Sequence, residues 1–267
     1  MTGEPDDASA RVPDDTWGVD FFQQGTTRWL GGFVRLLRVG ERCWYWAYLV
    51  GSDLGLVVVR DHEVTPPRRD VVLDVRADGL WAELVCETPG EHWTIGLEAF
   101  AVRLDAPVDA LHGEIGERLP VGLDLEWETG DVGPPPTIGG SVHGDVLVAA
   151  DRIELDGAGV FRRTTAPETG WPTAWSGALL LDRPASWVSV GRVESGTTID
   201  GLPVPLAGEL ADGRTVRCEA RAVVPVPLQV EASGRGSVLM RVLTRVHGDG
   251  GVTGSGWLEM LHSRVPA

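Results

Sequence analysis

Glycine and proline recur along the whole of this chain and limit what it can fold into. They account for 35 and 18 of its 267 residues. Glycine in a helix loses much conformational entropy, and proline lacks the N–H that a helix needs. The intervals between them are short runs of β-branched and aromatic residues, with turn signals at intervals of roughly 8–12 residues. This pattern predicts an all-β protein, a sandwich or barrel, with under about a tenth of its residues in helix.

The order of the strand-like runs predicts two antiparallel β units in tandem. Asp-Gly dipeptides, which favour hairpin turns, occur at 78–79, 156–157 and 212–213. The helix candidate is the segment 107–119. The run "GDVGPPPTIGG" at 130–140 breaks the pattern, because three consecutive prolines cannot continue the interior of a sheet. We therefore expect a disordered acidic segment at 1–13, a first β domain at 14–133 and a second at 134–267.

The charge balance argues against several classes of partner. The net charge is −16, which repels phosphate backbones and anionic lipids, so neither nucleic acid nor a membrane surface is an expected partner. All 23 basic residues are arginine, and the chain has no lysine and no asparagine. A high-GC genome, such as an actinobacterium's, accounts for that bias. The absence of lysine excludes a Schiff-base lysine and a Walker A lysine.

The location of the protein is predicted from its cysteines and its apolar runs. Cys43, Cys86 and Cys218 lack metal-ligand spacing and are expected to be reduced thiols. The first fifteen residues are acidic and lack the apolar region of a signal peptide. No run of 18 apolar residues occurs, so we expect no membrane span and a cytoplasmic protein. The oligomeric state is left open.

The stretch "RCWYWAYLVG" at 42–51 is apolar on both faces of the strand that it predicts. Side chains alternate along a strand, which separates its residues into two sets. One set has large rings: Trp44, Trp46 and Tyr48. The other set is Cys43, Tyr45, Ala47 and Leu49, with small side chains at 43 and 47. Two interpretations stay open: a barrel wall beside a cavity, or a strand between two sheets that fills a core. As a cavity wall, the ring-bearing face would line a ligand cavity and the other would pack on a second layer.

The succession of several segments resembles a known family. These are "DDTWGVDFF", "CWYWAYLV", "WSGALLLDRPASWVSVGRVESG" and the closing "GVTGSGWLEMLH". Together they resemble the tandem lipocalin-like family related to carotenoid 1,2-hydratase (hydroxyneurosporene synthase) and the lipocalin-like Diels–Alderases of fungi. The resemblance covers about residues 14–262 and implies two lipocalin-like antiparallel β-barrels or half-barrels in tandem. Where relatives carry an Arg-Asp-His-Trp-Gly-like run, residues 159–171 have neither His nor Asp, so roles of those groups are not carried over.

Motifs for metal, nucleotide or triad chemistry are missing from the sequence. There is no G-x-S-x-G, no H-E-x-x-H and no G-x-G-x-x-G that opens a helix. The six histidines are scattered and predict no metal site. We therefore expect a protein that uses neither a metal nor any other cofactor.

Aromatic residues are the most distinctive candidates for a binding site, since the chain has 11 Trp. Aromatic rings suit a flat, apolar, polyunsaturated ligand and stabilise developing positive charge. The alternative is that these rings only fill the core. The candidate substrate-binding residues are Trp44, Trp46, Trp93, Phe100, Trp175 and Trp257.

Three residues are candidates for catalysis. Glu98 is the single charge on one face of 94–104, and its burial would raise its pKa and suit it to general acid work. The alternative is that Glu98 pairs with an arginine such as Arg35, or sits at a bulge. Glu259 shares a face with Trp257 and is the second acid. Tyr48 could donate a hydrogen bond to a substrate carbonyl.

These residues predict a cofactor-independent cyclase or lyase that acts on an apolar polyene or isoprenoid. A general acid could protonate an alkene and so drive hydration or cyclisation. Alternatively, the pocket could fold the polyene for a Diels–Alder-type reaction, which needs orientation and no triad. The alternative outside catalysis is a binding or carrier protein for a hydrophobic metabolite, because fold alone does not decide function.

Overall fold

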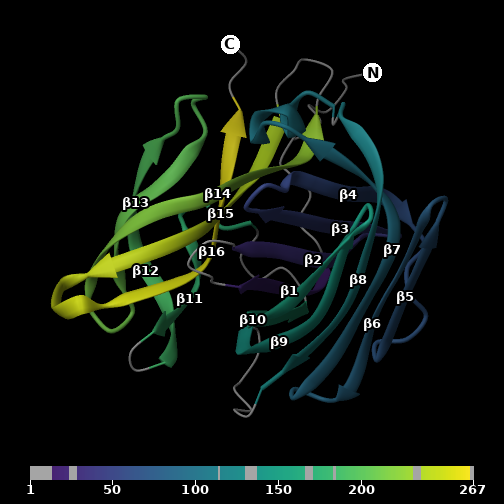
Figure 1. Ribbon diagram of the computed structural model, residues 1–267, viewed down its shortest axis with the longest axis horizontal. Coiled ribbons are helices and arrows are strands. Elements are labelled where there is room, and N and C mark those ends of the chain that lie inside the picture. Colours follow the sequence, from purple (N-terminus) through teal and green to yellow (C-terminus); the bar gives the residue numbers. More distant parts are fainter. Residues whose placement is uncertain are drawn as a thin grey trace, which may run out of the picture.

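The computed structural model describes residues 14–23, 29–113, 115–129, 137–165, 171–182, 185–230 and 236–264. Within these ranges nearly all regular structure is β-strand, which confirms the all-β prediction (Figure 1). In this described part of the chain, helix is limited to two 3-10 turns, η1 (Pro107–Leu111) and η2 (Asp249–Gly251). Neither turn has the length or the apolar character of a membrane crossing. The segment 1–13, expected to be disordered, lies outside the described residues.

The first sheet has ten antiparallel strands in the order β4-β3-β2-β1-β10-β9-β8-β7-β6-β5. The far end of β7 also pairs with β4, at Leu56 with Leu104 and Val58 with Val102. This pairing closes eight strands into a ring and leaves β5 and β6 as an extension of β7. The strands are β1 (Asp15–Gln23), β2 (Leu30–Val39), β3 (Arg42–Gly51), β4 (Gly55–Val64), β5 (Val72–Ala77), β6 (Leu80–Thr88), β7 (His92–Leu104), β8 (Glu117–Glu128), β9 (Thr137–Val148) and β10 (Asp151–Thr165).

The second sheet is a closed antiparallel barrel of six strands in sequence order. Its first strand pairs with its last, so no edge is left open. It lies beside β1–β3 of the first sheet, at the left of Figure 1. The strands are β11 (Ser176–Asp182), β12 (Ala185–Thr197), β13 (Pro203–Leu210), β14 (Thr215–Val230), β15 (Gly236–Gly248) and β16 (Thr253–Arg264).

The chain passes from the first sheet to the second later in the sequence than the predicted domain boundary at 133/134. β9 pairs along its length with β8, and β10 pairs with β1, so both belong to the first sheet. The proline run therefore connects two neighbouring antiparallel strands and does not separate two domains. The first sheet ends at Thr165 and the second begins at Ser176. Residues 130–136, which hold the prolines, lie outside the described residues.

Two of the three Asp-Gly dipeptides form the predicted turns. Gly79 and Gly213 have φ of +73° and +86° and connect β5 to β6 and β13 to β14. The turn expected at 156–157 is wrong, because these residues lie inside β10. Gly157 is needed there for a different reason: a Cβ would collide with the carbonyl oxygen of Phe22 in β1.

The helix expected over 107–119 is also wrong. The 3-10 turn η1 ends at Leu111, and β8 begins at Glu117. Gly113 between them has φ of +102°, a conformation that no right-handed helix contains. The remaining residues of the expected helix pair with β7, from Glu117 opposite Arg103 onward.

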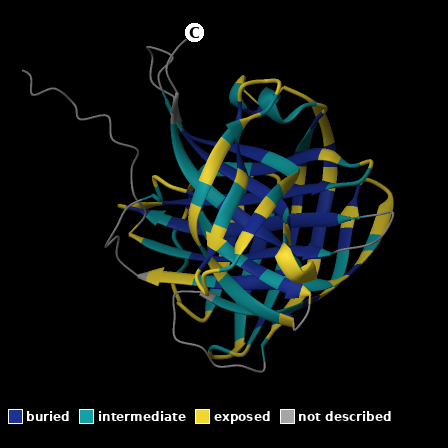
Figure 2. Cartoon of the chain, turned by 90° about the vertical axis from the view of Figure 1, so that its left-hand side faces the viewer, coloured by how far each residue is buried: buried dark blue, intermediate teal, exposed yellow. Residues whose placement is uncertain are grey.

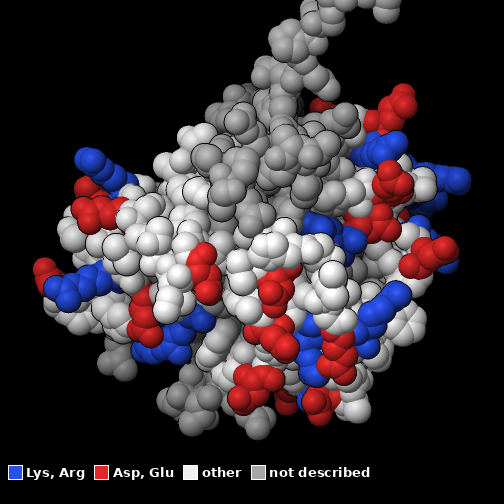
Figure 3. Space-filling view, turned by 90° about the horizontal axis from the view of Figure 1, so that it is seen from above, with Lys and Arg blue, Asp and Glu red and all other residues white. Residues whose placement is uncertain are grey.

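Buried apolar side chains form three clusters: the interior of the first ring, the interior of the second barrel, and the inter-sheet layer between them. Figure 2 shows buried stretches (dark blue) along strands that carry exposed residues elsewhere. Acidic and basic side chains are interspersed over the outer surface seen in Figure 3. Each strand from β1 to β3 is buried on both faces, one towards the ring interior and one towards the second barrel. The sequence "RCWYWAYLVG" is apolar on both sides for this reason.

The two faces of β3 are the reverse of the predicted assignment. Cys43, Tyr45, Ala47 and Leu49 point into the interior of the eight-stranded ring. The other face, with the aromatic side chains of Trp44, Trp46 and Tyr48, packs in the inter-sheet layer. The ring interior is filled by aliphatic and aromatic side chains. Cys43 and Ala47 of β3 are small, and the same interior holds larger side chains such as Trp17 and Trp127, so large and small residues share its volume.

Candidate functional site in the inter-sheet layer

A cluster of five charged side chains lies in the inter-sheet layer. Asp20 accepts hydrogen bonds from Arg35 at 2.6 and 2.8 Å, and from Arg241 at 2.6 Å. Arg162 donates to Asp20 at 3.2 Å and to Glu259 at 3.3 Å. The Arg35 and Arg241 side chains also lie 3.7 and 3.4 Å from the Glu259 carboxylate. Since β1, β2 and β10 supply three of these residues and β15 and β16 supply two, the cluster joins the two sheets.

Gly18 makes room for this cluster on the surface of β1. It lies in register between Arg35 of β2 and Arg162 of β10. A Cβ at position 18 would come within 2.6 Å of the Arg35 Cδ atom. Both arginines can therefore cross over the strand and reach Asp20, which lies two residues further along the same face.

The charges of the cluster are held in their ionised forms. Burial alone would raise the pKa of Asp20, but Arg241, Arg35 and Arg162 together hold it far below its usual range. Burial also acts to raise the pKa of Glu259, and the same three guanidinium groups outweigh it and lower the pKa. Burial lowers the pKa of Arg35 to about 9, so that residue is still charged at neutral pH. Three cations against two anions leave the cluster with one excess positive charge.

Aromatic rings surround the buried end of the cluster. The Arg241 guanidinium lies 4.0 Å above the Phe33 ring centroid and 5.4 Å from that of Trp257. Phe33 stacks in turn on Tyr48, with ring centroids 4.9 Å apart. The Trp257 indole donates a hydrogen bond of 2.9 Å to the Phe21 carbonyl oxygen across the two sheets. The structure thus brings the predicted residues Tyr48, Trp257 and Glu259 into one neighbourhood.

Trp44 and Trp46 form a second aromatic group in the same layer. Trp44 stacks on His62 with centroids 4.4 Å apart, and Trp46 donates a 2.9 Å hydrogen bond to His62 Nε2. Trp46 also stacks on Trp171 at 6.1 Å. Burial, together with the nearby Arg60, lowers the pKa of His62 to about 4. The histidine is therefore neutral at pH 7, and its Nε2 accepts the hydrogen bond from the indole N–H of Trp46.

Two adjoining cavities open between the sheets. The smaller has a volume of about 20 Å³, enough for one water molecule, and the larger about 320 Å³. Trp29 and Arg221 line both cavities. The smaller cavity is otherwise lined by Phe22, Gln23, Leu243, Arg245 and Ser255. The larger is otherwise lined by Val50, Gly51, Gly55, Leu56, Asp105, Pro107, Thr198, Asp200, Leu202, Ala220, Ala222 and Val223.

Glu98 and Phe100 lie elsewhere, on the outer face of the first sheet. Both side chains are exposed and line a groove of about 650 Å³ together with Trp81 and Leu147. The expectation of a buried Glu98 is wrong, because the inward face of β7 is the odd-numbered one that includes Trp93 and Leu97. Glu98 does not pair with Arg35, which is bound to Asp20 instead.

Trp93 and Trp175 belong to the interiors of the two sheets. Trp93 stacks on Phe161 in the ring interior, with centroids 4.5 Å apart. Trp175 packs in the second barrel and donates a 2.8 Å hydrogen bond to the Ser195 hydroxyl. These contacts give both indoles a packing role, and the structure does not bring them to the inter-sheet layer.

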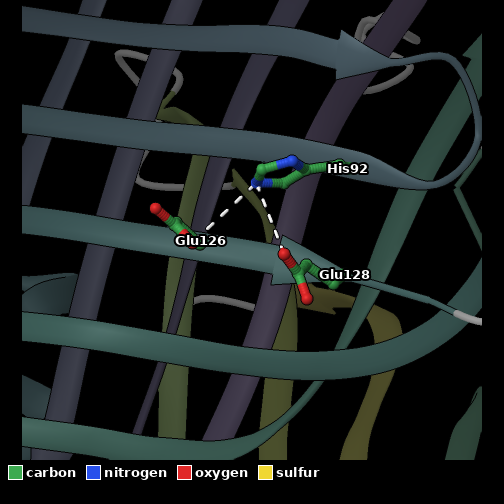
Figure 4. A group of neighbouring side chains, drawn as sticks. All are labelled: His92, Glu126 and Glu128. Atoms are coloured by element: carbon green, nitrogen blue, oxygen red, sulfur yellow. Dashed lines mark ion pairs between the residues drawn. The ribbon is translucent and has the colours of Figure 1, made fainter.

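One group of side chains has the composition of a metal-ligand set. His92, Glu126 and Glu128 project from the paired ends of β7 and β8, with their ligand atoms within 4.8 Å of one another (Figure 4). The glutamates are 58% and 52% exposed and lie 4.0 and 3.8 Å from the histidine Nε2. Water competes strongly for groups so exposed, so the arrangement is accounted for as a surface charge cluster.

Sequence reasoning missed four members of the charged cluster: Asp20, Arg35, Arg162 and Arg241. A signal was present for three of them. Asp20 in "VDFF", Arg35 in "FVRLL" and Arg241 in "LMRVL" are each a single charge inside an apolar run. Charges in strands buried on both faces need partners, and here both arginines pair with Asp20.

Comparisons with known proteins identify the fold. No protein-family model matches the chain, and the search of curated proteins found no match. A solved structure of a candidate AttH protein from Nitrosomonas europaea is 14% identical with a TM-score of 0.58, and the match covers 97% of this chain and 95% of that one. That likeness shows a shared fold.

Two further solved structures match over most of their length. Kievitone hydratase from Nectria haematococca is 12% identical with a TM-score of 0.49, over 96% of this chain and 90% of that one. CghA in complex with Sch210972 is 9% identical with a TM-score of 0.44, over 94% and 88%. The likeness to the Nitrosomonas europaea structure is the one that confirms the predicted relation, at the level of the fold alone.

Proposed function

We propose that the protein is a cofactor-independent cyclase or lyase that holds an apolar polyene or isoprenoid between its two sheets. The observation that carries this proposal is the pair of adjoining cavities whose walls come from both sheets. Their linings combine aromatic, aliphatic and guanidinium groups, the mixture typical of small-molecule sites. Trp29, Leu56 and Val223 supply apolar wall, and Arg221 supplies hydrogen-bond donors.

The candidate acids favour one of the two possible reactions. Protonation of an alkene needs a neutral carboxylic acid at the site. Glu259 has a lowered pKa and is a carboxylate at neutral pH, and Glu98 lies on the outer face. Folding of a polyene into a reactive conformer needs only a shaped pocket, which supports a Diels–Alder-type cyclisation over acid-catalysed hydration.

Polar groups near the cavities would assist such a cyclisation by polarising a substrate carbonyl. Guanidinium groups held in an apolar surrounding stabilise developing negative charge on oxygen. Arg221 and Arg245 line the smaller cavity, and Arg241 lies on the same face of β15. Tyr48 stays in the proposal as a hydrogen-bond donor to the substrate carbonyl. Its ring stacks on the Phe33 ring, which also faces Arg241.

A carrier of a hydrophobic metabolite is the second candidate function. The observation that favours it is that Glu259 is held as a carboxylate, while Glu98 lies on the outer face away from these cavities. Both functions place the ligand in the same cavities and differ only in turnover. We also place the protein in the cytoplasm, which the three free thiols support.

A matched pair of substitutions tests the location of the ligand. Ala222 lines the larger inter-sheet cavity, and Ala77 lines the outer groove; both are half-buried. Ala222→Phe should weaken binding of N-phenyl-1-naphthylamine, a neutral apolar dye, by about tenfold, because a ring fills the space. Ala77→Phe should leave it within about twofold. The reverse result would place the ligand in the outer groove.

Turnover then separates the enzyme from the carrier. Small molecules that purify with the chain are identified by mass spectrometry and incubated with fresh protein. Conversion to a product of equal mass indicates cyclisation, and a gain of 18 mass units, that of one water molecule, indicates hydration. Recovery of the unchanged molecule, with binding still sensitive to Ala222→Phe, supports the carrier.

A further inference from the structure

The polar residues of the two cavities are distributed unevenly. Arg221 and Arg245 line the smaller cavity, and none of the described residues in its lining is acidic. The larger cavity is lined by Asp105 and Asp200, which take no part in the smaller one. An elongated ligand that occupies both cavities therefore meets cations at one end and anions at the other.

A β-bulge directs Arg221 towards the cavities. Ala220 pairs with Thr244 and Ala222 pairs with Leu243, so Arg221 is an extra residue in β14 without a cross-strand partner. Bulges re-aim side chains and are frequent beside functional sites. The side chain is 31% exposed, and its Nε lies 3.8 Å from the exposed Glu219 carboxylate. That long, solvent-exposed contact leaves most of the guanidinium donors available.

Arg245 is held in place by the pairing of β15 with β16. It lies directly opposite Ser255, whose side chain is buried and uncharged, and two residues from Leu243 on the same face. Its Nε is buried and has no hydrogen-bond partner among the described residues. A buried donor without a partner is unfavourable, so a ligand atom that accepts this hydrogen bond would be stabilised.

The charged cluster increases the positive field at this end. Arg241 lies four residues before Arg245 on the same face of β15, and its cluster carries one excess positive charge. A local excess of cations is unusual in a chain with 39 acidic and 23 basic residues. Inside a layer of low dielectric this field acts strongly on a nearby anion.

We propose that the ligand of the inter-sheet cavities carries a negatively charged group, a carboxylate or an enolate, that Arg221 and Arg245 bind. This inference rests on the proposed function and narrows its substrate class from any apolar polyene to an amphiphilic organic anion. The apolar body occupies the larger cavity between Trp29 and Leu56. The anionic group points to the smaller cavity, away from Asp105 and Asp200.

Two dyes that differ in one group test this inference on the full chain. 8-Anilinonaphthalene-1-sulfonate has the ring system of N-phenyl-1-naphthylamine and adds a sulfonate. Arg221→Met and Arg245→Met should each raise the Kd of the anionic dye about tenfold, as for a lost charge-assisted hydrogen bond, and leave that of the neutral dye within about twofold. Arg245→Lys should retain most of the affinity for the anion.

The control is Arg76→Met, at a different arginine-lined groove on the first sheet. It should change neither Kd, and thermal melts of all variants exclude a loss of folding as the cause. Equal losses for both dyes in the Arg221 and Arg245 variants, or no loss for either, would overturn the inference. A loss of anion binding in Arg76→Met instead would overturn it too.

The outcome is separable from that of the proposed function. If Ala222→Phe weakens the neutral dye while the arginine variants leave the anionic dye unaffected, the cavity is the site and the ligand is not an anion. If Ala222→Phe affects neither dye, the cavity itself is not the site, and both proposals fail.

Discussion

The ring interior and the inter-sheet layer are both buried, but they are built from different materials. The ring interior is packed with aliphatic and aromatic side chains, and all ten strands of the first sheet contribute their inward-facing residues to it. The inter-sheet layer combines large rings with Asp20, Arg35 and Arg241, the three charged residues that are buried within the described part of the chain. The cavities with walls from both sheets open in that second layer.

The difference shows where a tandem β protein has room for a ligand. A ring of eight strands is just wide enough for its own side chains to fill it. Two curved sheets that meet face to face cannot match everywhere, so gaps and polar groups collect between them. We therefore expect changes in the ring interior to affect stability alone, and changes in the inter-sheet layer to affect stability, pH response and ligand binding.

The largest expected effect comes from breaking the charged cluster. Asp20→Asn leaves three guanidinium groups, two of them buried, with Glu259 as their single remaining counter-ion in the cluster, and it should lower the free energy of unfolding by about 3–5 kcal/mol. Urea titrations at pH 7 measure this loss. Asp74→Asn, at an exposed position, is the control and should change the free energy by under about 0.5 kcal/mol. A loss below about 1 kcal/mol for Asp20→Asn would mean that the cluster is not what joins the sheets.

A matched pair of leucines separates the two layers most clearly. Leu49 lies in the ring interior and Leu243 lines the smaller cavity, and both are almost fully buried. Each Leu→Ala change should cost about 2–5 kcal/mol of stability. The dye affinity of the folded protein should change in Leu243→Ala and stay constant in Leu49→Ala. The comparison fails if both variants retain the affinity of the unaltered chain.

Acid should weaken the inter-sheet layer before the ring interior. Asp20 and Glu259 have pKa values below their usual values of 3.8 and 4.5, so the unfolded chain takes up protons more readily than the folded one. Their contribution to stability is present above about pH 4.5 and declines as the pH falls below it. Unfolding free energies measured between pH 7 and pH 3 should fall steeply below that point, and less steeply in Asp20→Asn.

His62 adds a milder response at higher pH. Its pKa falls from 6.5 to about 4 on folding, so the unfolded chain takes the proton first and stability declines as the pH drops from about 6.5 to 4. His62→Gln keeps an acceptor for the Trp46 indole but does not titrate. Melting temperatures at pH 7 and pH 5 should therefore differ less in this variant, and an unchanged difference would show that His62 is not the cause.

The smallest effect is expected at Glu98. Its side chain is exposed on the outer groove and away from the inter-sheet layer. Glu98→Gln should change the free energy of unfolding by under about 0.5 kcal/mol and leave dye binding and turnover as they are. A large loss of turnover in this variant would restore Glu98 as the catalytic acid and move the site to the outer face.

Local signals in the sequence were enough for the strand content and two turns. Asp78-Gly79 and Asp212-Gly213 were read correctly because a positive φ at glycine determines such turns locally. The prediction for Asp156-Gly157 is wrong because Gly157 is required by a contact with another strand: a Cβ there would collide with the carbonyl oxygen of Phe22. The predicted domain boundary at 133/134 has the same kind of cause. Only the pairing of β9 with β8 and β10 shows that the strands after the prolines belong to the first sheet.

The candidate site shows the same limit. Trp257, Tyr48 and Glu259 are each conspicuous in their own strand, and the structure places all three in the inter-sheet layer. Which face of β3 or β7 points inward depends on what lies beyond the strand, and periodicity alone gives two equal answers. The partners of Asp20 come from strands as far away as β15, so the cluster could be suspected from single charges in apolar runs but not assembled.

The most direct test of a ligand site between the sheets is a crystal structure of the chain with 8-anilinonaphthalene-1-sulfonate bound. We expect density for the aromatic rings of the dye between Trp29, Leu56 and Val223, with the sulfonate within hydrogen-bond distance of Arg221 or Arg245. Density in the outer groove, against Trp81 and Phe100, with the inter-sheet cavities unchanged, would contradict this expectation.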